Sequence, residues 1–314
     1  MPLSVSAPRA ALGVAKKQGL MPPAWVGDLF GLFGLFGETE PVPVLSSEDL
    51  SLDLTVGRGF CLASVRVHGA RDLDRRAFQE ATVLVYRLIE AELRGCGTLH
   101  PVRLWNHIPG IHEPMGDGQD RYMVFNAGRY EALSVWFGGN ETFDTRVASA
   151  SGVGHDGRDL VVHCLAAQRP GRAVANPRQI APYRYSSRYG PLPPCFARAT
   201  VIEPAGEPLV LVGGTASIVG EDSVHVGDLE KQADETLANL AALIHEAAGE
   251  GDERAWALAC YRDVRVYYPD PDRLDSLRVL LAGAFPGAKA VEWVRADLCR
   301  TDLLVEIEGV AKLR

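Results

Sequence analysis

Strand-like and helix-like patterns follow one another twice along this chain, and this repetition constrains the fold more than any other feature. In the first half, an alternating strand pattern at 59–68 precedes an amphipathic helix predicted for 72–94. In the second half, the apolar residues of 228–248 recur with the helical period. Asp228 is the expected N-cap of that helix and Gly249 its stop. Each half therefore predicts a sheet covered by helices on one face, which is the α+β class.

The remaining predicted elements complete the two halves. Strands are expected at 102–105, 160–166, 196–203, 209–212, 263–268, 291–298 and 303–310, and helices at 121–137 and 270–284. We expect a segment of unassigned role at 1–50, an α+β domain at 51–190 and a second domain at 191–314, with the boundary near 190–194. A Gly/Leu/Phe repeat at 30–37 is expected to pack over a core.

Charge and cysteine usage limit the partners of the chain. Forty acidic and 32 basic residues give a formal charge of −8, which argues against nucleic acid or an anionic membrane as the main partner. No apolar run has the length of a membrane span, and residues 1–18 lack the apolar core of a signal peptide. The cysteines form no C-x-x-C pair, which predicts reduced thiols in a cytoplasmic protein; they are Cys61, Cys96, Cys164, Cys195, Cys260 and Cys299.

Two carboxylates share one face of an apolar strand near the C-terminus. Alternation along 303–309 directs Val305 and Ile307 to one side and Glu306 and Glu308 to the other. On a solvated face both acids would be ordinary surface residues, and the pattern alone favours this interpretation. In a poorly solvated cleft, burial would raise the pKa and make such a group a proton donor near neutral pH.

An acid-free segment rich in arginine and tyrosine suggests an anion site. No aspartate or glutamate lies between Asp159 and Glu203. Arginine forks and tyrosine hydroxyls suit the recognition of carboxylates or phosphates. The alternative is a solvated loop whose arginines pair with acids elsewhere, and the pattern leaves both open. The residues concerned are Arg169, Arg172, Arg178, Arg184, Arg188, Arg198, Tyr183, Tyr185 and Tyr189.

Two glycine-containing segments and the histidines carry weaker signals. Residues 152–157 match G-x-G-x-x-G, but a strand rather than a helix follows, so we predict a glycine-rich turn and no dinucleotide site. Small residues at 213–217 end a strand, which suits either close approach of a ligand or a tight turn. His107 and His112 are separated by a Pro-Gly pair and have no evident third ligand, so no metal site is expected.

From about Leu104 onward the chain resembles the chorismatases. Its second half, about 194–313, also resembles the RidA/YjgF fold through the Gly-Thr-Ala-Ser segment at 214–217, Gly227-Asp228 before the amphipathic helix, and the closing Val-Glu-Ile-Glu segment. The resemblance implies two RidA/YjgF-like (chorismate mutase-like) domains, no cofactor, and a monomer. The chorismatase-like stretches lie at 105–111, 128–133, 151–154, 176–177, 185–200 and 302–309.

The resemblance implies removal of the enolpyruvyl group of chorismate as pyruvate. It makes Glu306 the general acid on the enol-ether methylene. Gly214 and Cys299 stand where we expect alanine in the hydrolase branch, so the chain resembles the 3-hydroxybenzoate synthases, formally lyases, which supply a starter unit for secondary metabolism. Cys299 would then assist catalysis. The implied substrate-binding residues are Arg129, Tyr185, Tyr189, Arg198, Gly214 and Thr215.

Two other functions remain open at this point. The first is a chorismate hydrolase that forms 3,4-dihydroxycyclohexa-1,5-diene carboxylate and pyruvate. The second is a non-catalytic RidA-like protein that binds a small ligand. Pyruvate release from chorismate distinguishes both enzymes from the binding protein, and the aromatic or diene product distinguishes the enzymes from each other.

Overall fold

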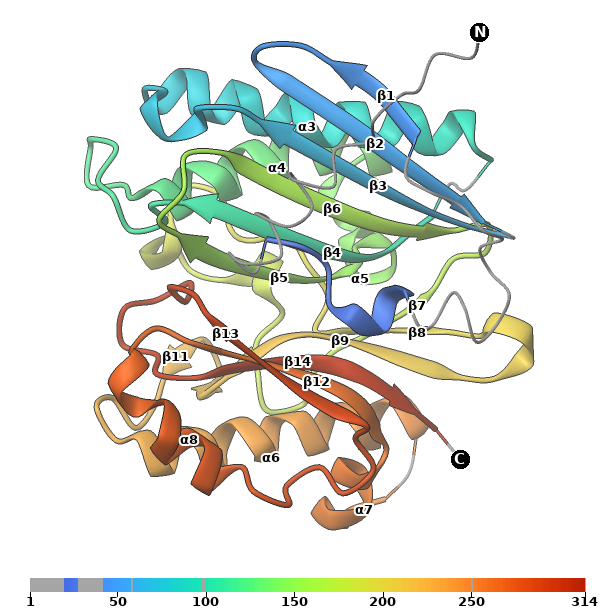
Figure 1. Ribbon diagram of the computed structural model, residues 1–314, viewed down its shortest axis with the longest axis vertical. Helices are drawn as coiled ribbons and strands as arrows, with labels where there is room; N and C mark the ends of the chain where they lie inside the picture. Colours follow the sequence, from blue (N-terminus) through green and yellow to red (C-terminus); the bar gives the residue numbers. More distant parts are fainter. Residues whose placement is uncertain (1–19, 28–41, 58, 98–99, 250, 314) are drawn as a thin grey trace, which may run out of the picture.

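Two six-stranded β-sheets lie against each other, and helices cover the outer face of each sheet (Figure 1). The computed structural model describes residues 20–27, 42–57, 59–97, 100–249 and 251–313. The predicted α+β class is confirmed. Within those residues, no helix has the length and apolar character needed to cross a membrane.

The first sheet has the strand order β1-β2-β3-β6-β4-β5. Its neighbouring strands are antiparallel except for β4 and β5, which are parallel. Helices α3 and α4 pack on its outer face. The elements of this half are β1 (Val42–Ser46), β2 (Leu50–Gly57), β3 (Phe60–Val67), η1 (Ala70–Asp72), α3 (Arg75–Gly95), β4 (His100–Pro109), α4 (Arg121–Phe137), η2 (Asn140–Thr142), α5 (Phe143–Arg146), β5 (Ser149–His155) and β6 (Leu160–Ala167).

The second sheet has the order β13-β12-β14-β9-β8-β7, and only β12 and β13 are parallel. Helices α6, α7 and α8 lie on its outer face (Figure 1). Its elements are β7 (Arg172–Val174), η3 (Pro182–Arg184), η4 (Ser187–Tyr189), β8 (Ala199–Ile202), η5 (Pro204–Gly206), β9 (Leu209–Ala216), β10 (Ile218–Val219), β11 (Asp222–Ser223), α6 (Leu229–Ala248), α7 (Arg254–Ala259), β12 (Tyr261–Tyr268), η6 (Pro271–Arg273), α8 (Leu274–Leu280), β13 (Ala290–Arg295) and β14 (Glu306–Lys312).

Capping residues determine where the long helices begin and end. The Asp228 carboxylate accepts a hydrogen bond from the backbone N–H of Lys231 at 3.0 Å, which satisfies one of the free donors at the start of α6. Gly249 ends this helix in the left-handed conformation, with φ of 77°. Both predicted caps are confirmed. Asp74 caps α3 in the same way, by accepting from the Ala77 N–H at 2.9 Å.

The faces that the helices leave open meet in a buried layer between the sheets. Trp105 on β4 packs there with Leu211 on β9 and Val310 on β14. Trp25, from the short N-terminal helical turn, joins this layer with its ring 5.8 Å from that of Trp105. The Ser149 hydroxyl on β5 donates to the Leu211 carbonyl at 2.8 Å. The two halves therefore share one interior, and polar residues of this layer are removed from water.

Several predicted elements differ from the structure. Residues 149–155 form β5, so the turn predicted for Gly152 is wrong; this strand pairs with β4 along its whole length. The strand predicted for 303–310 begins only at Glu306, because pairing with β9 starts there, opposite Ala216. The helix predicted for 270–284 is shorter, with a first turn in η6 and an end at Leu280. The helix at 121–137 is confirmed at both ends.

The N-terminal part of the first sheet was missed. Leu50, Leu52 and Leu54 alternate with polar residues in β2, a signal that predicts this strand. The Gly/Leu/Phe repeat at 30–37 lies outside the described residues. The second sheet already includes β7, which precedes the expected boundary near 190–194.

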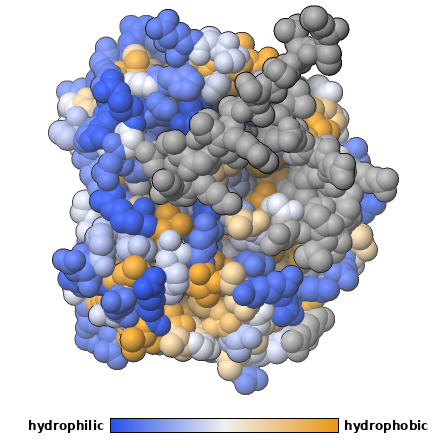
Figure 2. All heavy atoms as spheres, viewed as in Figure 1, coloured by the Kyte–Doolittle hydropathy of each residue, from blue (hydrophilic) through white to orange (hydrophobic). Residues whose placement is uncertain are grey.

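The described surface mixes polar and apolar residues. On the face drawn in Figure 2, hydrophilic residues lie between separate apolar patches rather than around one continuous one. Exposed large apolar side chains are scattered over several elements, with Val135 on α4 and Val279 on α8 as examples. Scattered residues of this kind are normal for a folded protein and indicate no docking site.

Gly128→Ala is expected to destabilise the protein. An added Cβ would lie 2.7 Å from the Gln79 carbonyl oxygen and 2.9 Å from Thr82 Cβ, so α3 and α4 would have to separate. Overpacking of this kind costs about 1–3 kcal/mol, more than the gain of up to about 1 kcal/mol from helix propensity. Urea unfolding followed by circular dichroism measures the change.

Gly95→Ala is the matched control for this prediction. No atom lies within 4 Å of a Cβ at this position, the last residue of α3. We expect an unchanged or slightly higher free energy of unfolding. Equal stability of the two variants would contradict the tight helix contact at Gly128.

Candidate active site

A cavity of about 440 Å³ lies between the two halves of the chain. Its walls come from the start of α4, from β5 and β9, and from segments 185–198 and 299–306. This volume is in the usual range for a small-ligand site. Its lining includes all but one of the residues predicted to act in catalysis or substrate binding, namely Glu306, Cys299, Arg129, Tyr185, Tyr189, Arg198 and Gly214.

Glu306 is the first residue of β14, and its side chain faces this cavity. The residue is only 4% exposed, so the interpretation of a solvated strand face is wrong. No group in the described part of the chain donates a hydrogen bond to its carboxyl. Burial, followed by the charge of Glu308, raises the pKa of Glu306 to about 8, and the opposing charges of Arg103 and Arg198 are already included in this value. The carboxyl is therefore mostly protonated at neutral pH.

Gly214 on β9 leaves the space that the Glu306 carboxyl occupies. A Cβ at this position would overlap Oε1 of Glu306 and lie 2.7 Å from its Cδ. Thr215, the next residue, is outside the cavity lining: it is opposite Ile307 in the β9–β14 pairing, and its hydroxyl donates to the Gly213 carbonyl at 3.0 Å. The group that lies close to this glycine segment is thus a side chain of the protein itself, the carboxyl of Glu306.

Two buried arginines face the cavity without a carboxylate partner among the described residues. Arg129 Nη2 donates to the Asn126 side-chain oxygen at 2.8 Å. Arg198 Nη2 donates to the Tyr185 hydroxyl and to the Ile180 carbonyl. The Nε–H of each arginine has no hydrogen-bond partner in the part of the chain that the structure describes. A buried cation without a counter-ion is costly, so a bound anion would be favoured here.

Tyrosine rings line another part of the wall together with a residue that sequence reasoning missed. Arg300 lies over the ring of Tyr189, with its guanidinium carbon 4.0 Å from the ring centroid, and 5.4 Å from that of Tyr185. Its Nη1 donates to the Glu221 carbonyl at 2.8 Å. No sequence pattern distinguishes this arginine. Its position next to Cys299 was the only available hint.

Arginines of the acid-free segment differ in whether they pair with a carboxylate. Arg178 pairs with Glu235, and Arg188 pairs with Glu221 and Asp222. The alternative of partners elsewhere in the chain is thus confirmed for these two. Arg198, from the same segment, has no carboxylate partner among the described residues; it lines the cavity, as Arg188 also does.

Cys299 lines the cavity as a neutral thiol. Its enclosed position, followed by the nearby Glu306, raises the pKa of the thiol to about 12. A thiol with this pKa is a weak hydrogen-bond donor and a poor nucleophile. The side chain therefore suits a packing or proton-handling role better than covalent catalysis.

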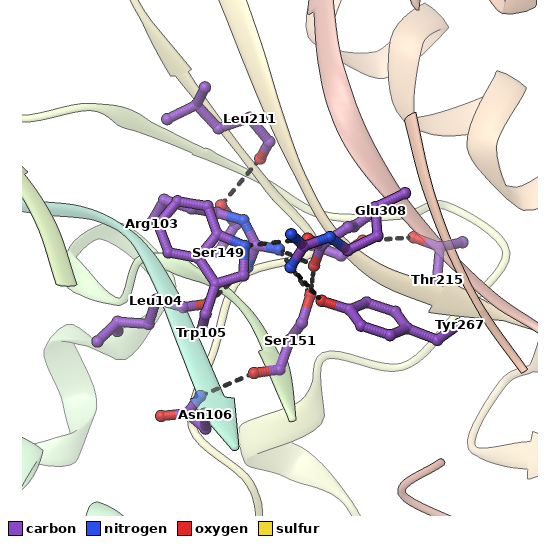
Figure 3. Close-up of polar contacts among 12 residues, drawn as sticks. Arg103, Leu104, Trp105, Asn106, Ser149, Ser151, Leu211, Thr215, Tyr267 and Glu308 are labelled. Carbon is purple, nitrogen blue, oxygen red and sulfur yellow. Dashed lines mark hydrogen bonds and ion pairs between the residues drawn. The ribbon is translucent and has the colours of Figure 1, made fainter. Parts of the chain in front are cut away.

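A buried polar cluster adjoins the cavity at Ser151, and Figure 3 shows its contacts. Glu308 accepts hydrogen bonds from Arg103 Nη2 at 2.6 Å, from Trp105 Nε1 at 3.0 Å and from the Ser151 hydroxyl. Arg103 and Glu308 are both 0% exposed. Because these residues come from β4, β5 and β14, the cluster joins the two sheets. Ser151 also lines the cavity, so it connects both sites.

Comparison with known proteins identifies the family. The family model described as chorismatase FkbO/Hyg5-like, N-terminal, matches residues 41–166. A chorismatase of Streptomyces rapamycinicus is 34% identical over 246 residues, 77% of this chain and 72% of that protein. A 3-hydroxybenzoate synthase of Streptomyces hygroscopicus is 33% identical over 240 residues, 74% of this chain and 69% of that protein.

One solved structure of a chorismatase agrees with this result. A crystal structure of a chorismatase aligns with a TM-score of 0.73 at 29% identity, covering 87% of this chain and 80% of that one. The E. coli YjgF gene product aligns over 46% of this chain and 99% of its own, with a TM-score of 0.33 at 17% identity. The identity and coverage of the curated relatives, together with the shared motifs, establish that this chain belongs to the chorismatase family.

Proposed function

We propose that this protein converts chorismate to 3-hydroxybenzoate and pyruvate, as a lyase that needs no cofactor. One observation carries the proposal: the protonated carboxyl of Glu306 faces the same cavity as Arg129 and Arg198, two buried cations without a carboxylate partner in the described chain. Chorismate offers the matching chemistry, because it has two carboxylates and an enol ether whose methylene carbon can accept a proton. Family membership supports the same substrate.

Protonation of the enol-ether methylene by Glu306 is the first step. A carbon atom that accepts a proton requires a neutral acid held close to it. The raised pKa of Glu306 keeps its carboxyl protonated at neutral pH. The step leaves a cationic ether carbon on the substrate and a carboxylate on Glu306. Arg198, whose charge favours the ionised form of Glu306, stabilises that carboxylate.

The ring hydroxyl of the substrate then captures the cation and forms a cyclic ketal; its proton passes to the Glu306 carboxylate and returns to the same oxygen when that oxygen leaves the ring. The bond between that hydroxyl oxygen and the ring breaks, the ring loses a proton and becomes aromatic, and the remaining hemiketal collapses to pyruvate and 3-hydroxybenzoate. The two products sum to chorismate with no water added. The ring proton restores Glu306 to its acid form, and the neutral thiol of Cys299 assists this transfer from the cavity wall.

The position of the Glu306 carboxyl favours this outcome over hydrolysis. Gly214 lets the carboxyl lie against the β9 backbone, where it occupies space that water would otherwise enter. In the alternative hydrolase, a water molecule captures the cation, and a diene acid leaves with its hydroxyls intact. We further infer that the protein acts as a monomer, because the open faces of both sheets are covered within one chain. We also infer that it acts in the cytoplasm and that its product serves as a starter unit in secondary metabolism.

Incubation of the protein with chorismate tests this function. We expect equal amounts of pyruvate and 3-hydroxybenzoate, measured by liquid chromatography and mass spectrometry.

Glu306→Gln removes the transferable proton while it keeps the shape of the side chain, so turnover should fall at least about a thousandfold. Calorimetry should still detect chorismate binding to this variant. Binding without pyruvate release in the unaltered protein would instead indicate a RidA-like binding protein.

The rate should fall with rising pH. Only protonated Glu306 can donate, and its pKa is about 8, so kcat/KM is expected to be level near pH 6.5 and to decrease about tenfold per pH unit above the pKa. Cys299, with a pKa of about 12, contributes nothing in this range. Initial rates of pyruvate release between pH 6.5 and 9.5 provide the profile. A rate that stays constant across this range would exclude Glu306 as the proton donor.

Replacing Gly214 and Cys299 together by alanine should shift the product from 3-hydroxybenzoate toward the diene acid. The new Cβ at position 214 displaces the Glu306 carboxyl, and the smaller side chain at 299 leaves room for water. The ratio of the two products measures the effect. Gly152→Ala is the control, since a Cβ at this cavity position would lie 3.3 Å from the Tyr122 ring, with no Glu306 atom among its nearest neighbours, and should leave the ratio unchanged. An unaltered ratio in the double variant would mean that these positions do not determine the product.

A further inference from the structure

We propose that Glu308 is a positioning residue for the acid catalyst: held as a buried anion by Arg103, it keeps the proton on Glu306 between turnovers. The inference rests on the proposed role of Glu306 as proton donor. The two glutamates alternate with Ile307 along β14, so they share one face of the strand. Glu306 opens to the cavity, and Glu308 lies one step deeper, between the sheets.

The surroundings of Glu308 fix it in the ionised form. Three side-chain donors converge on its two oxygens: Arg103 at 2.6 Å, Trp105 at 3.0 Å and the hydroxyl of Ser151 (Figure 3). A carboxylate accepts all three bonds, and two of the three donors, the Arg103 guanidinium and the Trp105 indole N–H, cannot accept a bond in return. Arg265 lies opposite Glu308 in the β12–β14 pairing and adds a second positive charge.

The charges around Glu306 act in both directions. Arg103 and Arg198 favour its ionised form, whereas burial and the negative charge of Glu308 favour the protonated one. Other titratable side chains near it carry no charge at neutral pH: Cys299 and Tyr122, whose pKa values burial raises, and Tyr267, opposite Glu306 on β12 and with its pKa raised in the same way. Glu308 is therefore the one negative charge among the described groups that act on Glu306.

Two acids on one strand thus have different protonation states. An adjacent anion makes the loss of a second proton unfavourable, so the carboxyl without donors keeps its proton and the one with three donors stays charged. Ser151 helps to maintain this difference, since it lines the cavity and yet donates to Glu308. A purely structural role, joining β4 and β5 to β14, would use the same contacts but would not require any effect on the titration of Glu306.

Infrared titration of the Glu306 carboxyl separates these two roles and needs no turnover. In protein labelled with ¹³C-glutamate, the band of Glu306 is the one that Glu306→Gln removes. We expect Glu308→Gln to lower its midpoint by about one pH unit, because the nearby negative charge is gone. The falling limb of kcat/KM should move to lower pH by the same amount, with little change in KM.

Tyr267→Phe is the matched control. It alters a neutral group in the same buried layer, where the Tyr267 hydroxyl accepts from Arg265 Nη1 at 3.3 Å, and leaves every charge in place. The Glu306 midpoint should stay where it is in the unaltered protein. An equal shift in this variant would mean that repacking of the layer, not the charge of Glu308, sets the titration.

Glu308→Gln leaves the buried Arg103 without its counter-ion, so this variant can fail to fold. The double variant Arg103→Met/Glu308→Gln removes both charges and avoids that cost. Its midpoint should also fall, though by less, because the opposing effect of Arg103 is lost as well. An unchanged or raised midpoint in a folded variant would overturn the proposal. A protein that releases no pyruvate from chorismate would refute the proposed function and still yield a readable titration.

Discussion

The buried ion pair between Arg103 and Glu308 is the interaction on which the rest of the site depends. It crosses from the first sheet to the second, and both partners are removed from water. Burial of two charges costs several kcal/mol each unless nearly every donor and acceptor is satisfied. The bonds from Trp105 and Ser151 bring the donors on the Glu308 carboxylate to three, and Arg103 also donates to the Leu104 carbonyl at 2.7 Å. The sheets must therefore meet in one register for the pair to form.

The same arrangement explains why Glu306 differs from Glu308, only two residues away. The apolar layer around Trp105 closes the space between the sheets at one side, and the cavity opens it at the other. Glu306 lies at this transition, buried enough to lose its hydration but not close enough to β4 and β5 to gain their donors. A carboxyl in that position retains its proton. The same burial that disfavours its charge is what suits it to the proposed role as an acid.

Local sequence patterns predict those parts of the molecule that depend on local interactions. The helix at 228–248 could be predicted with both ends because Asp228 and Gly249 act on their own backbone. Alternation also correctly put Glu306 and Glu308 on one face. The sequence of β14 alone could not predict that this face is buried. The residues that cover it are Arg103 and Ser151, which lie more than 150 positions earlier in the chain. The site residues came from family motifs, and Arg300, which no motif marked, was missed.

In the proposed reaction, the access of water to the cavity determines which product forms. Once the enolpyruvyl carbon is cationic, the outcome depends on whether a ring hydroxyl or a water molecule reaches it first. The intramolecular hydroxyl has the advantage of proximity, which is retained only while water is excluded. The absence of a side chain at Gly214 allows the Glu306 carboxyl to lie against the strand that forms this wall. The proposed reaction thus assigns protonation and water exclusion to one side chain, so a change in the position of Glu306 should alter the rate and the product together.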